Sequence, residues 1–453
     1  MDWTRALRSA SVTVSETLEP CRETPVNCGK TLRKGAIVQM IPQMTPSPWN
    51  GIAERMLAAV AIKIELPPSK HALMCQRKAA IEKHLEREGS ELRGKVRLFY
   101  QQGSVAIGAT IRAKFRFEGF DIDIIVELDW PGLSPQQALD KLFVAMRGDK
   151  GSTYYDMTQR QTRCVTVHYA DGMHIDLSPS VLLNPNDPRR SYIFHSKPEE
   201  DRSKDKRVLT NSFGFALEYN KRCPVDIDFQ QEYARRALAA DLGYSMVQKD
   251  ADSVPVPMHS TVVGGKSAVT VALQLLKRNR NIRWANREGR MPASVMLSAL
   301  SLEAARPGRT IGQNLLAITQ HILDRLLEAK MRGALISVEN PICAGDCFTD
   351  RWPEDHVAQD LFIGDMRLLL SQLAILHDER RSLRERQDVL KQMFGEEVGQ
   401  AVFDEFADDL STKIQTGQHA FGAMGGVLAV PASASAKPSV KPSTFYGTTW
   451  RPE

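Results

Sequence analysis

The chain has 453 residues, of which 42% are hydrophobic and 25% charged, and its formal net charge is +5. This length allows two globular domains, or one large domain with extensions, and the composition is ordinary for a globular protein. The mildly basic charge suits a protein that handles phosphates, although a solvated basic surface explains it equally well.

The cysteines and the apolar runs limit where the protein can act. The seven cysteines are odd in number and scattered, so we exclude a disulfide framework and expect a reducing compartment. Residues 1–20 contain no apolar segment of signal-peptide type, and the longest apolar run, 56–62, is too short to cross a bilayer. We therefore expect a cytoplasmic protein without a membrane association.

The predicted elements begin after a weakly ordered N-terminal extension, residues 1–47. Helices are predicted at 48–66 and 70–88, a strand at 95–102, a second strand at 120–130 and a helix at 134–146 with Ser134 as its N-cap. Two further strands, 162–170 and 173–181, are separated by Asp171-Gly172, which is a strong hairpin signal.

The second half of the chain is predicted to be helical. Apolar residues recur at helical spacing in 266–284, in 314–332 and from about 355 to 410. The helical signal fades after about 417, and 429–443 is a linker rich in Pro, Ala and Ser. The predicted organisation is an extension (1–47), an α+β core (48–222), an α-helical lobe (223–415) and a flexible tail (416–453).

Carboxylates gather on one face of the strand at 120–130. Alternate side chains of a strand point to opposite faces, so Asp121, Asp123 and Glu127 share a face in "FDIDIIVELD". The other face carries Phe120, Ile122, Ile124, Val126 and Leu128. In the later hairpin strand, His174 and Asp176 share a face in the same way. If the two strands are neighbours, a third carboxylate lies beside the first two.

Three converging carboxylates repel one another unless cations neutralise them. Hard oxygen ligands suit Mg²⁺, and a pair of metal ions activates an attacking hydroxyl and stabilises a leaving pyrophosphate. The turn Gly103-Ser104 precedes a helix start, where glycine lets the backbone approach a triphosphate and amide N–H groups bind it. A DxD or a GS alone is most often structural, but their order along this chain is far more specific.

These motifs resemble those of the polymerase-β-like nucleotidyltransferases, and within them the bacterial cGAS/DncV-like nucleotidyltransferases (CD-NTases) of CBASS anti-phage systems. "QQGSVAIGAT" resembles the family's GS loop, "DIDI" its first two metal ligands and "HIDLSPSV" its third. "ALQLLKRNRNIRW", "VENPICAGDCFTDRW" and "STFYG" resemble later family segments, and the resemblance spans about 48–415. The chain departs from the family pattern at Val105, Asn279 and Asn281.

The resemblance implies an α+β fold: a mixed-sheet core with N-terminal helices, an α-helical C-terminal lobe and a central cleft. It implies that NTPs, ATP among them, are joined into a cyclic di- or trinucleotide second messenger. Asp121, Asp123 and Asp176 would bind two Mg²⁺ ions, with Mn²⁺ as the alternative metal, and Asp176 would position or deprotonate the attacking 2′ or 3′ hydroxyl. The nucleotide phosphates would contact Gly103, Ser104, Lys277 and Ser294.

The sequence leaves two further functions open. The chain is alternatively a nucleotidyltransferase that makes linear oligonucleotides or modifies RNA or a small molecule, or a catalytically silent nucleotide-binding protein. Lys277 is alternatively part of a solvated basic helix end. The segment 262–269 is rejected as a P-loop because Ser260 stands where that motif needs glycine.

Two features concern partners and a second metal. Cys343 and Cys347, with His356 nearby, are either zinc ligands or incidental thiols. The aromatic segment 443–450 follows the linker and is predicted to dock on the chain itself or on an operon-encoded accessory protein. No stable nucleic-acid partner is expected. The sequence does not give the bases used, the ring size, the linkage, the activating signal or the oligomeric state.

Overall fold

The computed structural model of the chain describes residues 51–112, 120–184, 189–248, 266–415, 419–421 and 427–429. They all belong to one compact unit, Pro46–Glu453, and the other unit, Met1–Thr45, lies outside them. The predictions for the N-terminal extension (1–47) and for the aromatic segment 443–450 therefore fall outside the described residues. Of the predicted tail, two short paired strands are described, β10 (His419–Phe421) and β11 (Val427–Ala429).

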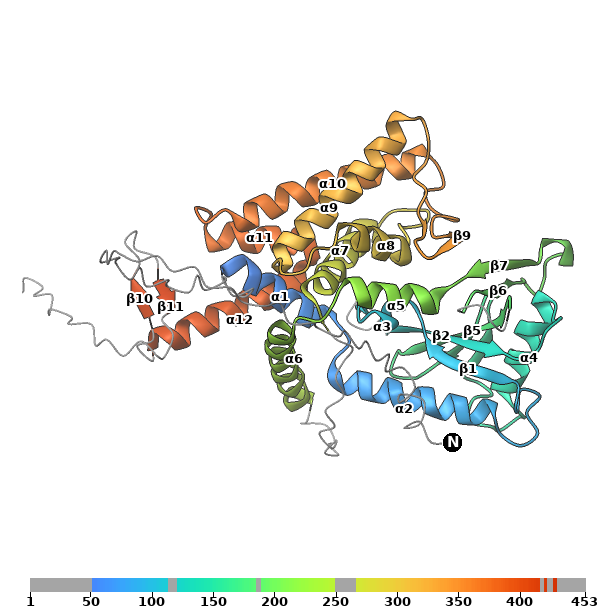
Figure 1. The fold of residues 1–453 in the computed structure, drawn as a ribbon. Coiled ribbons are helices and arrows are strands. Elements are labelled where there is room, and N and C mark those ends of the chain that lie inside the picture. Colours follow the sequence, from blue (N-terminus) through green and yellow to red (C-terminus); the bar gives the residue numbers. More distant parts are fainter. Residues whose placement is uncertain are drawn as a thin grey trace, which may run out of the picture. The chain divides into compact units, whose positions relative to one another are not determined.

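The largest sheet among the described residues has seven strands (Figure 1). Five lie in the order β1–β2–β5–β4–β3, and β6 and β7 continue from β5. The β2–β5 pair is parallel and the other pairs are antiparallel. The strands are β1 (Val96–Gln101), β2 (Asp121–Leu128), β3 (Thr158–Arg160), β4 (Val165–His168), β5 (His174–Leu182), β6 (Ser191–His195) and β7 (Lys206–Thr210).

Two helices, α2 (Pro68–Leu85) and α4 (Pro135–Arg147), pack on the apolar face of this sheet. Ile122, Ile124 and Val126 of β2 are buried in one cluster with apolar residues of both helices, as strand alternation predicts. The hydroxyl of Ser134 accepts a hydrogen bond from the backbone N–H of Gln137, which confirms the predicted N-cap of α4. The opposite face carries the polar side chains of the same strands.

The predicted hairpin is present. β4 and β5 pair in antiparallel fashion across residues 171–172. The carboxylate of Asp171 forms ion pairs of 2.9 Å with Lys70 and with Arg77, both on α2. The turn is therefore fastened to the helix that covers the sheet.

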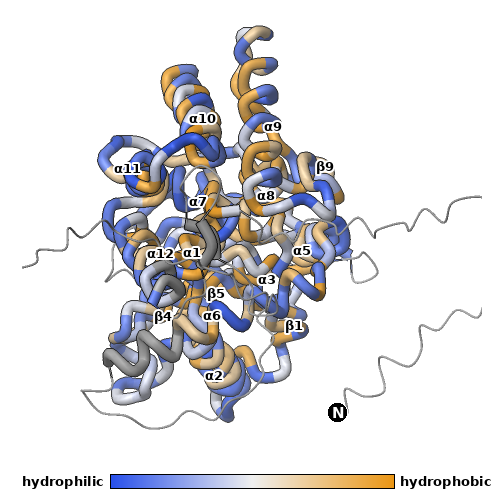
Figure 2. The backbone as a smooth tube through the Cα atoms, turned by 90° about the vertical axis from the view of Figure 1, so that its left-hand side faces the viewer, coloured by the Kyte–Doolittle hydropathy of each residue, from blue (hydrophilic) through white to orange (hydrophobic). Residues whose placement is uncertain are grey.

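The change to helical structure after about residue 224 is confirmed. The run predicted at about 355–410 divides at turns near Asp378 and Gly395. Figure 2 shows hydrophobic and hydrophilic residues interleaved along α9 and α10, and no described helix combines the length and the apolar character that a membrane span requires. The helices are α6 (Ile227–Gln248), α7 (Ala268–Trp284), α8 (Ser294–Ala304), α9 (Ile311–Met331), α10 (His356–His377), α11 (Leu383–Phe394) and α12 (Glu396–Gln415).

The first helix, α1 (Ile52–Ile64), packs with these later helices. Met56, Leu57 and Val60 are buried in the same apolar cluster as residues of α7, α9 and α10. Glu54 is also buried, and its carboxylate accepts hydrogen bonds from the hydroxyl of Thr310 (2.7 Å) and from the N–H of Gly312 at the start of α9. The helical cluster therefore contains the first described helix of the chain.

A small hairpin joins the helical cluster to the sheet. It consists of β8 (Glu339–Asn340) and β9 (Cys343–Cys347). The buried carboxylate of Asp346 accepts hydrogen bonds from the backbone N–H of Asn211 (3.0 Å) and from the amide of Asn340 (2.9 Å). Asn211 is the N-cap of α5 (Ser212–Arg222), so the segment 338–352, "VENPICAGDCFTDRW", holds the helix that follows β7.

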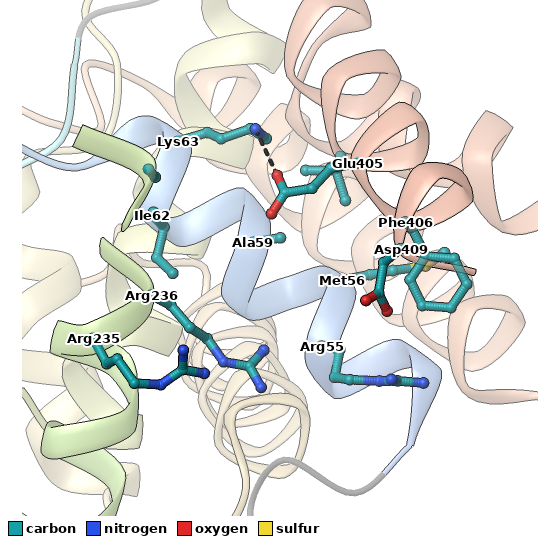
Figure 3. A pocket seen from close by; sticks show the side chains of 12 residues that line it. Arg55, Met56, Ala59, Ile62, Lys63, Arg235, Arg236, Glu405, Phe406 and Asp409 are labelled. Carbon is teal, nitrogen blue, oxygen red and sulfur yellow. Dashed lines mark ion pairs between the residues drawn. The ribbon is translucent and has the colours of Figure 1, made fainter. Parts of the chain in front are cut away.

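A groove of about 480 Å³ lies among α1, α6 and α12 (Figure 3). Its walls include four basic side chains, Arg55, Lys63, Arg235 and Arg236. Lys63 forms a 2.8 Å ion pair with Glu405 across the groove. The groove shares no residue with the carboxylates of the sheet.

Candidate active site

The predicted carboxylates are neighbours on the polar face of the sheet. Asp123 of β2 pairs in register with Asp176 of β5, and Asp121 pairs with His174. Because paired residues of parallel strands point to the same face, the third carboxylate lies directly beside the second. The strand pairing that the prediction required is therefore present.

The electrostatics of this face favour a cation. Burial, together with the charges of Asp176 and Asp121, raises the pKa of Asp123 to about 7, while Lys277 opposes the shift. Oxygen donors of this kind suit Mg²⁺, so the residues fit the implied metal. No group of three or more His, Cys, Asp or Glu side chains in the described ranges is already arranged to hold an ion. Substrate phosphate oxygens would have to complete the coordination.

Thr166 holds the third carboxylate in place. It pairs in register with Asp176, and its hydroxyl donates a 2.6 Å hydrogen bond to Oδ1 of that residue. Cys164 lies 3.9 Å from the hydroxyl of Thr166, and burial and Asp176 raise the pKa of its thiol to about 12. A thiol with this pKa stays protonated and is a poor nucleophile. Thr166 was not predicted from the sequence, although it occupies a polar position of an alternating strand.

The Gly-Ser turn begins a short helix directly against Asp123. This helix is α3 (Gly103–Ala106). Gly103 has a φ of +59°, and a Cβ on it would lie 3.0 Å from Oδ2 of Asp123. The backbone N–H of Gln102 donates a 2.9 Å hydrogen bond to the carbonyl of Asp123. Glycine is therefore required for both the backbone conformation and the close approach, and Ser104 follows it in the first turn.

Three successive carbonyls after α3, at residues 108–110, are bound by side chains at the start of the helical half. They accept hydrogen bonds from Lys266 (2.6 Å), Lys277 (2.8 Å) and Gln274 (2.9 Å), in that order. All three side chains are buried. We call these three contacts the carbonyl latch. The latch ties the segment after the Gly-Ser turn to α7.

The structure decides between the two interpretations of the basic segment in α7. Lys277, Arg278 and Arg280 are each at most 5% exposed, so the solvated helix end is wrong for these residues. Burial and the charge of Arg280 lower the pKa of Lys277 to about 7, while Asp123 opposes the shift. Lys277 therefore acts electrostatically on the carboxylates and hydrogen bonds the carbonyl of Ala109; its contact with a phosphate stays a prediction.

Ser294 is the first residue of α8. Its hydroxyl accepts a 3.0 Å hydrogen bond from Arg280, which also donates to the carbonyl of Pro292 (2.7 Å). Burial lowers the pKa of Arg280 to about 10. Asn279, one of the departures from the family pattern, is fully buried and donates to the carbonyl of Met393. The role of Ser294 toward phosphate stays a prediction.

Lys266 and the two candidate zinc ligands, Cys343 and Cys347, contact other protein side chains or are buried. Lys266, from the rejected P-loop segment, forms a buried 2.9 Å ion pair with Glu65; residues 262–265 lie outside the described part of the chain. Cys343 is buried, and the sulfur of Cys347 lies 3.3 Å from the hydroxyl of Thr349. Cys343 and Cys347 belong to no candidate metal cluster in the described residues.

A family profile matches the part of the chain that carries this site. The profile is that of the Second Messenger Oligonucleotide or Dinucleotide Synthetase domain, and it matches residues 54–194. The matched stretch contains the Gly-Ser turn and all three aspartates.

Two relatives extend the similarity over most of the chain. The cyclic dinucleotide synthase CdnG of Bradyrhizobium diazoefficiens is 35% identical over 397 residues, which cover 87% of this chain and 93% of the relative. The c-di-GMP synthase of Roseivirga ehrenbergii is 22% identical over 397 residues, which cover 87% and 97%.

Solved structures agree with the fold. Bradyrhizobium diazoefficiens CdnG in complex with GTP matches with a TM-score of 0.68 and 33% identity, covering 80% of this chain and 100% of that chain. The CdnC:HORMA-deltaN complex of Escherichia coli MS115-1 matches with a TM-score of 0.52 and 13% identity, covering 76% and 97%, and supports the fold alone. The predicted α+β architecture is confirmed, and the chain belongs to the CD-NTases, the bacterial cGAS/DncV-like nucleotidyltransferases of polymerase-β-like fold.

Proposed function

We propose that this CD-NTase, a nucleotidyltransferase that makes cyclic oligonucleotides, joins two NTPs into a cyclic dinucleotide and uses GTP as a substrate. The observation that carries the proposal is the register of Asp123 with Asp176, together with the approach of Gly103 to Asp123. Guanine nucleotides are favoured because the relative with 33% identity was solved with GTP. ATP as a second substrate stays a prediction from the resemblance.

The three aspartates divide the work. Asp121 and Asp123 would hold both Mg²⁺ ions, and Asp176 would complete the set from the neighbouring strand. When bound, the ions lower the pKa of the attacking hydroxyl and neutralise charge on the leaving pyrophosphate. Asp176, oriented by Thr166, accepts the proton of the 2′ or 3′ hydroxyl.

The first turn of α3 takes the donor nucleotide. The N–H groups around Gly103 and the hydroxyl of Ser104 bind its triphosphate. The attacking oxygen forms a bond to the α-phosphorus, and the bond from that phosphorus to the β-phosphate oxygen breaks, so pyrophosphate leaves. A second transfer within the linear intermediate closes the ring. Lys277 supplies positive charge to the same site, and Ser294 lies at the start of α8 beside Arg280.

The biological setting of this activity is part of the proposal. The resemblance to CBASS synthases favours a signal in anti-phage defence, made in the cytoplasm, and an accessory protein acting on the C-terminal tail. The tail residues that would carry this contact lie outside the described part of the chain. A role in defence is tested by phage plating with and without the three aspartates.

The activity itself is tested by incubating the purified chain with α-³²P-labelled NTPs, Mg²⁺ and then phosphatase. We expect a phosphatase-resistant product, because a ring has no terminal phosphate, and mass spectrometry gives its bases and size. A product that loses its terminal phosphates to phosphatase, and keeps only the label of its internal phosphodiester, would support the linear-product alternative. No product from the wild type, with NTP binding retained, would support the silent nucleotide-binding alternative. An Asp121→Asn, Asp123→Asn double variant is the control and should form no product.

A further inference from the structure

A row of polar side chains crosses the active face beside the aspartates. Asp121 on β2, His174 on β5 and His168 on β4 are successive in-register partners. The row ends at Gln159 on β3, whose side-chain oxygen lies 3.1 Å from Nε2 of His168. The row therefore starts at one of the proposed metal ligands and runs across β5 and β4 to β3.

The two histidines are hydrogen bonded to each other. Nδ1 of His168 lies 2.8 Å from Nδ1 of His174, with the rings edge to face. If Nε2 of His168 donates to the oxygen of Gln159, the neutral ring of His168 accepts at Nδ1, so His174 donates from Nδ1. In this arrangement Nε2 of a neutral His174 is a hydrogen-bond acceptor. That nitrogen has no partner among the described residues.

The row does not serve the apolar core. Val165, Val167 and Ile175 of the same two strands point to the opposite face and are completely buried there. His168 and His174 are only partly buried. Their pairing therefore arranges the polar face, on which substrate binds under the proposed function.

The position of His174 indicates which substrate group it contacts under the proposed function. Neighbouring strands lie about 4.8 Å apart, so His174 stands about one strand spacing from Asp121 and two residues along β5 from Asp176. The attacking ribose hydroxyl must lie at those aspartates. The substrate group closest to an attacking 2′ or 3′ hydroxyl is the other hydroxyl of the same ribose, which is a hydrogen-bond donor and matches the acceptor on His174.

We propose that His174 accepts a hydrogen bond from the ribose hydroxyl vicinal to the attacking one, and that His168 and Gln159 orient its ring for this purpose. The row thereby fixes which hydroxyl attacks and so determines the 2′–5′ or 3′–5′ linkage. This inference rests on the proposed function, and it makes His174 a specificity-determining residue rather than a metal ligand.

The test combines a His174→Ala variant with substrate analogues. Wild type and variant each receive the NTP that the chain turns over, its 2′-deoxy form and its 3′-deoxy form. The analogue that still reacts keeps the attacking hydroxyl and lacks its neighbour. In the wild type this loss should lower kcat/KM about 2- to 10-fold, the effect of one neutral hydrogen bond, whereas in the variant it should change little.

The NTP analogue serves both as donor and as acceptor, and its effect as donor should be the same in wild type and variant. The difference between the two proteins therefore measures the contact of His174 with the missing hydroxyl. Equal losses in wild type and variant would overturn the inference. Linkage analysis with a nuclease specific for 3′–5′ bonds is the second readout, and it applies even where neither analogue reacts. The variant should yield a mixture of linkages, and an unchanged single linkage would also overturn the inference.

Two controls separate a ribose contact from a metal contact and from a general effect of removing a histidine. Mn²⁺ binding in the presence of a non-hydrolysable NTP should be the same in wild type and variant; weaker binding would show that His174 acts on the metal and would overturn the inference. His321 is a partly exposed histidine of α9 that is paired with Glu303, and the His321→Ala variant should behave as wild type in every assay. A wild type without any NTP turnover would refute the proposed function. An active wild type whose loss of kcat/KM with the deoxy analogue equals that of His174→Ala would refute this inference alone.

Discussion

At the scale of single residues, Gly103 has the most stringent requirement in the site. Its positive φ disfavours any side chain, and the space where a Cβ would stand is within 3.0 Å of the Asp123 carboxylate. A side chain here would push the Gly-Ser turn away from β2, the strand that carries Asp121 and Asp123. Gly94 has a similar φ of +67°, but a Cβ built on it would have no atom within 4 Å. Substitution of Gly94 therefore tests backbone strain without the close contact.

We predict that Gly103→Ala lowers kcat/KM by at least about 100-fold, because misplacement by a fraction of an ångström is costly in a reacting geometry. Gly94→Ala should lower stability by about 1 kcal/mol through backbone strain and leave kcat/KM unchanged. Steady-state kinetics and thermal melts of both variants measure this. If Gly103→Ala kept more than a tenth of the wild-type activity, the turn would not be placed by its contact with Asp123.

Residue by residue, the sequence predicted what is local. The facing of Asp121 and Asp123 follows from strand alternation, and Asp176 follows from the same rule once the strands are neighbours. Thr166 was missed because its partner is set by the register of β4 on β5. The burial of Arg278 and Arg280 was missed because helical periodicity does not show that Arg278 hydrogen bonds Phe394 of α11 and Arg280 hydrogen bonds Ser294 of α8.

At the scale of elements, the carbonyl latch connects α7 with the segment that follows α3. Gln274 is completely buried and makes a hydrogen bond across 164 residues of sequence. Both elements were predicted from the sequence, but the latch depends on long-range contacts that periodicity does not encode. We therefore expect changes in α7, a helix of the second half, to affect the placement of the Gly-Ser turn.

We predict that Gln274→Leu, which keeps the volume and removes the donor, destabilises the chain by about 1–3 kcal/mol because the Thr110 carbonyl is left unpaired in a buried place. Amide exchange of residues 107–111 should accelerate, and the KM for NTP should rise while the linkage of the product is unchanged. Hydrogen exchange by mass spectrometry checks the first effect. Gln320→Leu, on the exposed side of α9, is the matched control. Unchanged exchange at 107–111 would contradict a role of the latch in positioning the turn.

At the scale of the whole molecule, two apolar clusters divide the described residues in a way that chain order does not. One contains the sheet with α2 and α4, and the other contains α1 with α5 to α12. The predicted boundary near residue 223 separates the sheet from α6 to α12 but assigns α1 and α5 to the sheet side. Amphipathic periodicity identified α1 as a helix; it could not give the partner of its apolar face.

We predict that a fragment of residues 223–415 does not fold alone. Without α1 it loses Met56, Leu57 and Val60 from its cluster, and the N-terminus of α9 loses the carboxylate of Glu54. Circular dichroism should show no cooperative melt for this fragment, whereas the same fragment fused through a flexible linker to residues 51–66 should recover one. A cooperative melt of the unfused fragment would show that α1 is dispensable for the helical cluster.

The parallel pairing of β2 with β5 has a consequence for how this chain can vary in length. The two aspartate-bearing strands are joined by α4, β3, β4 and their loops, whereas the register of Asp123 with Asp176 is that of the ladder between β2 and β5. Residues can therefore be gained or lost in the connecting loops without disturbing the site. One residue gained within 121–123 or 174–176 would instead turn a carboxylate from the polar face into the apolar core, because side chains alternate with a period of two. We therefore expect the loops of this connection to vary in length, and the starts of β2 and β5 to keep theirs.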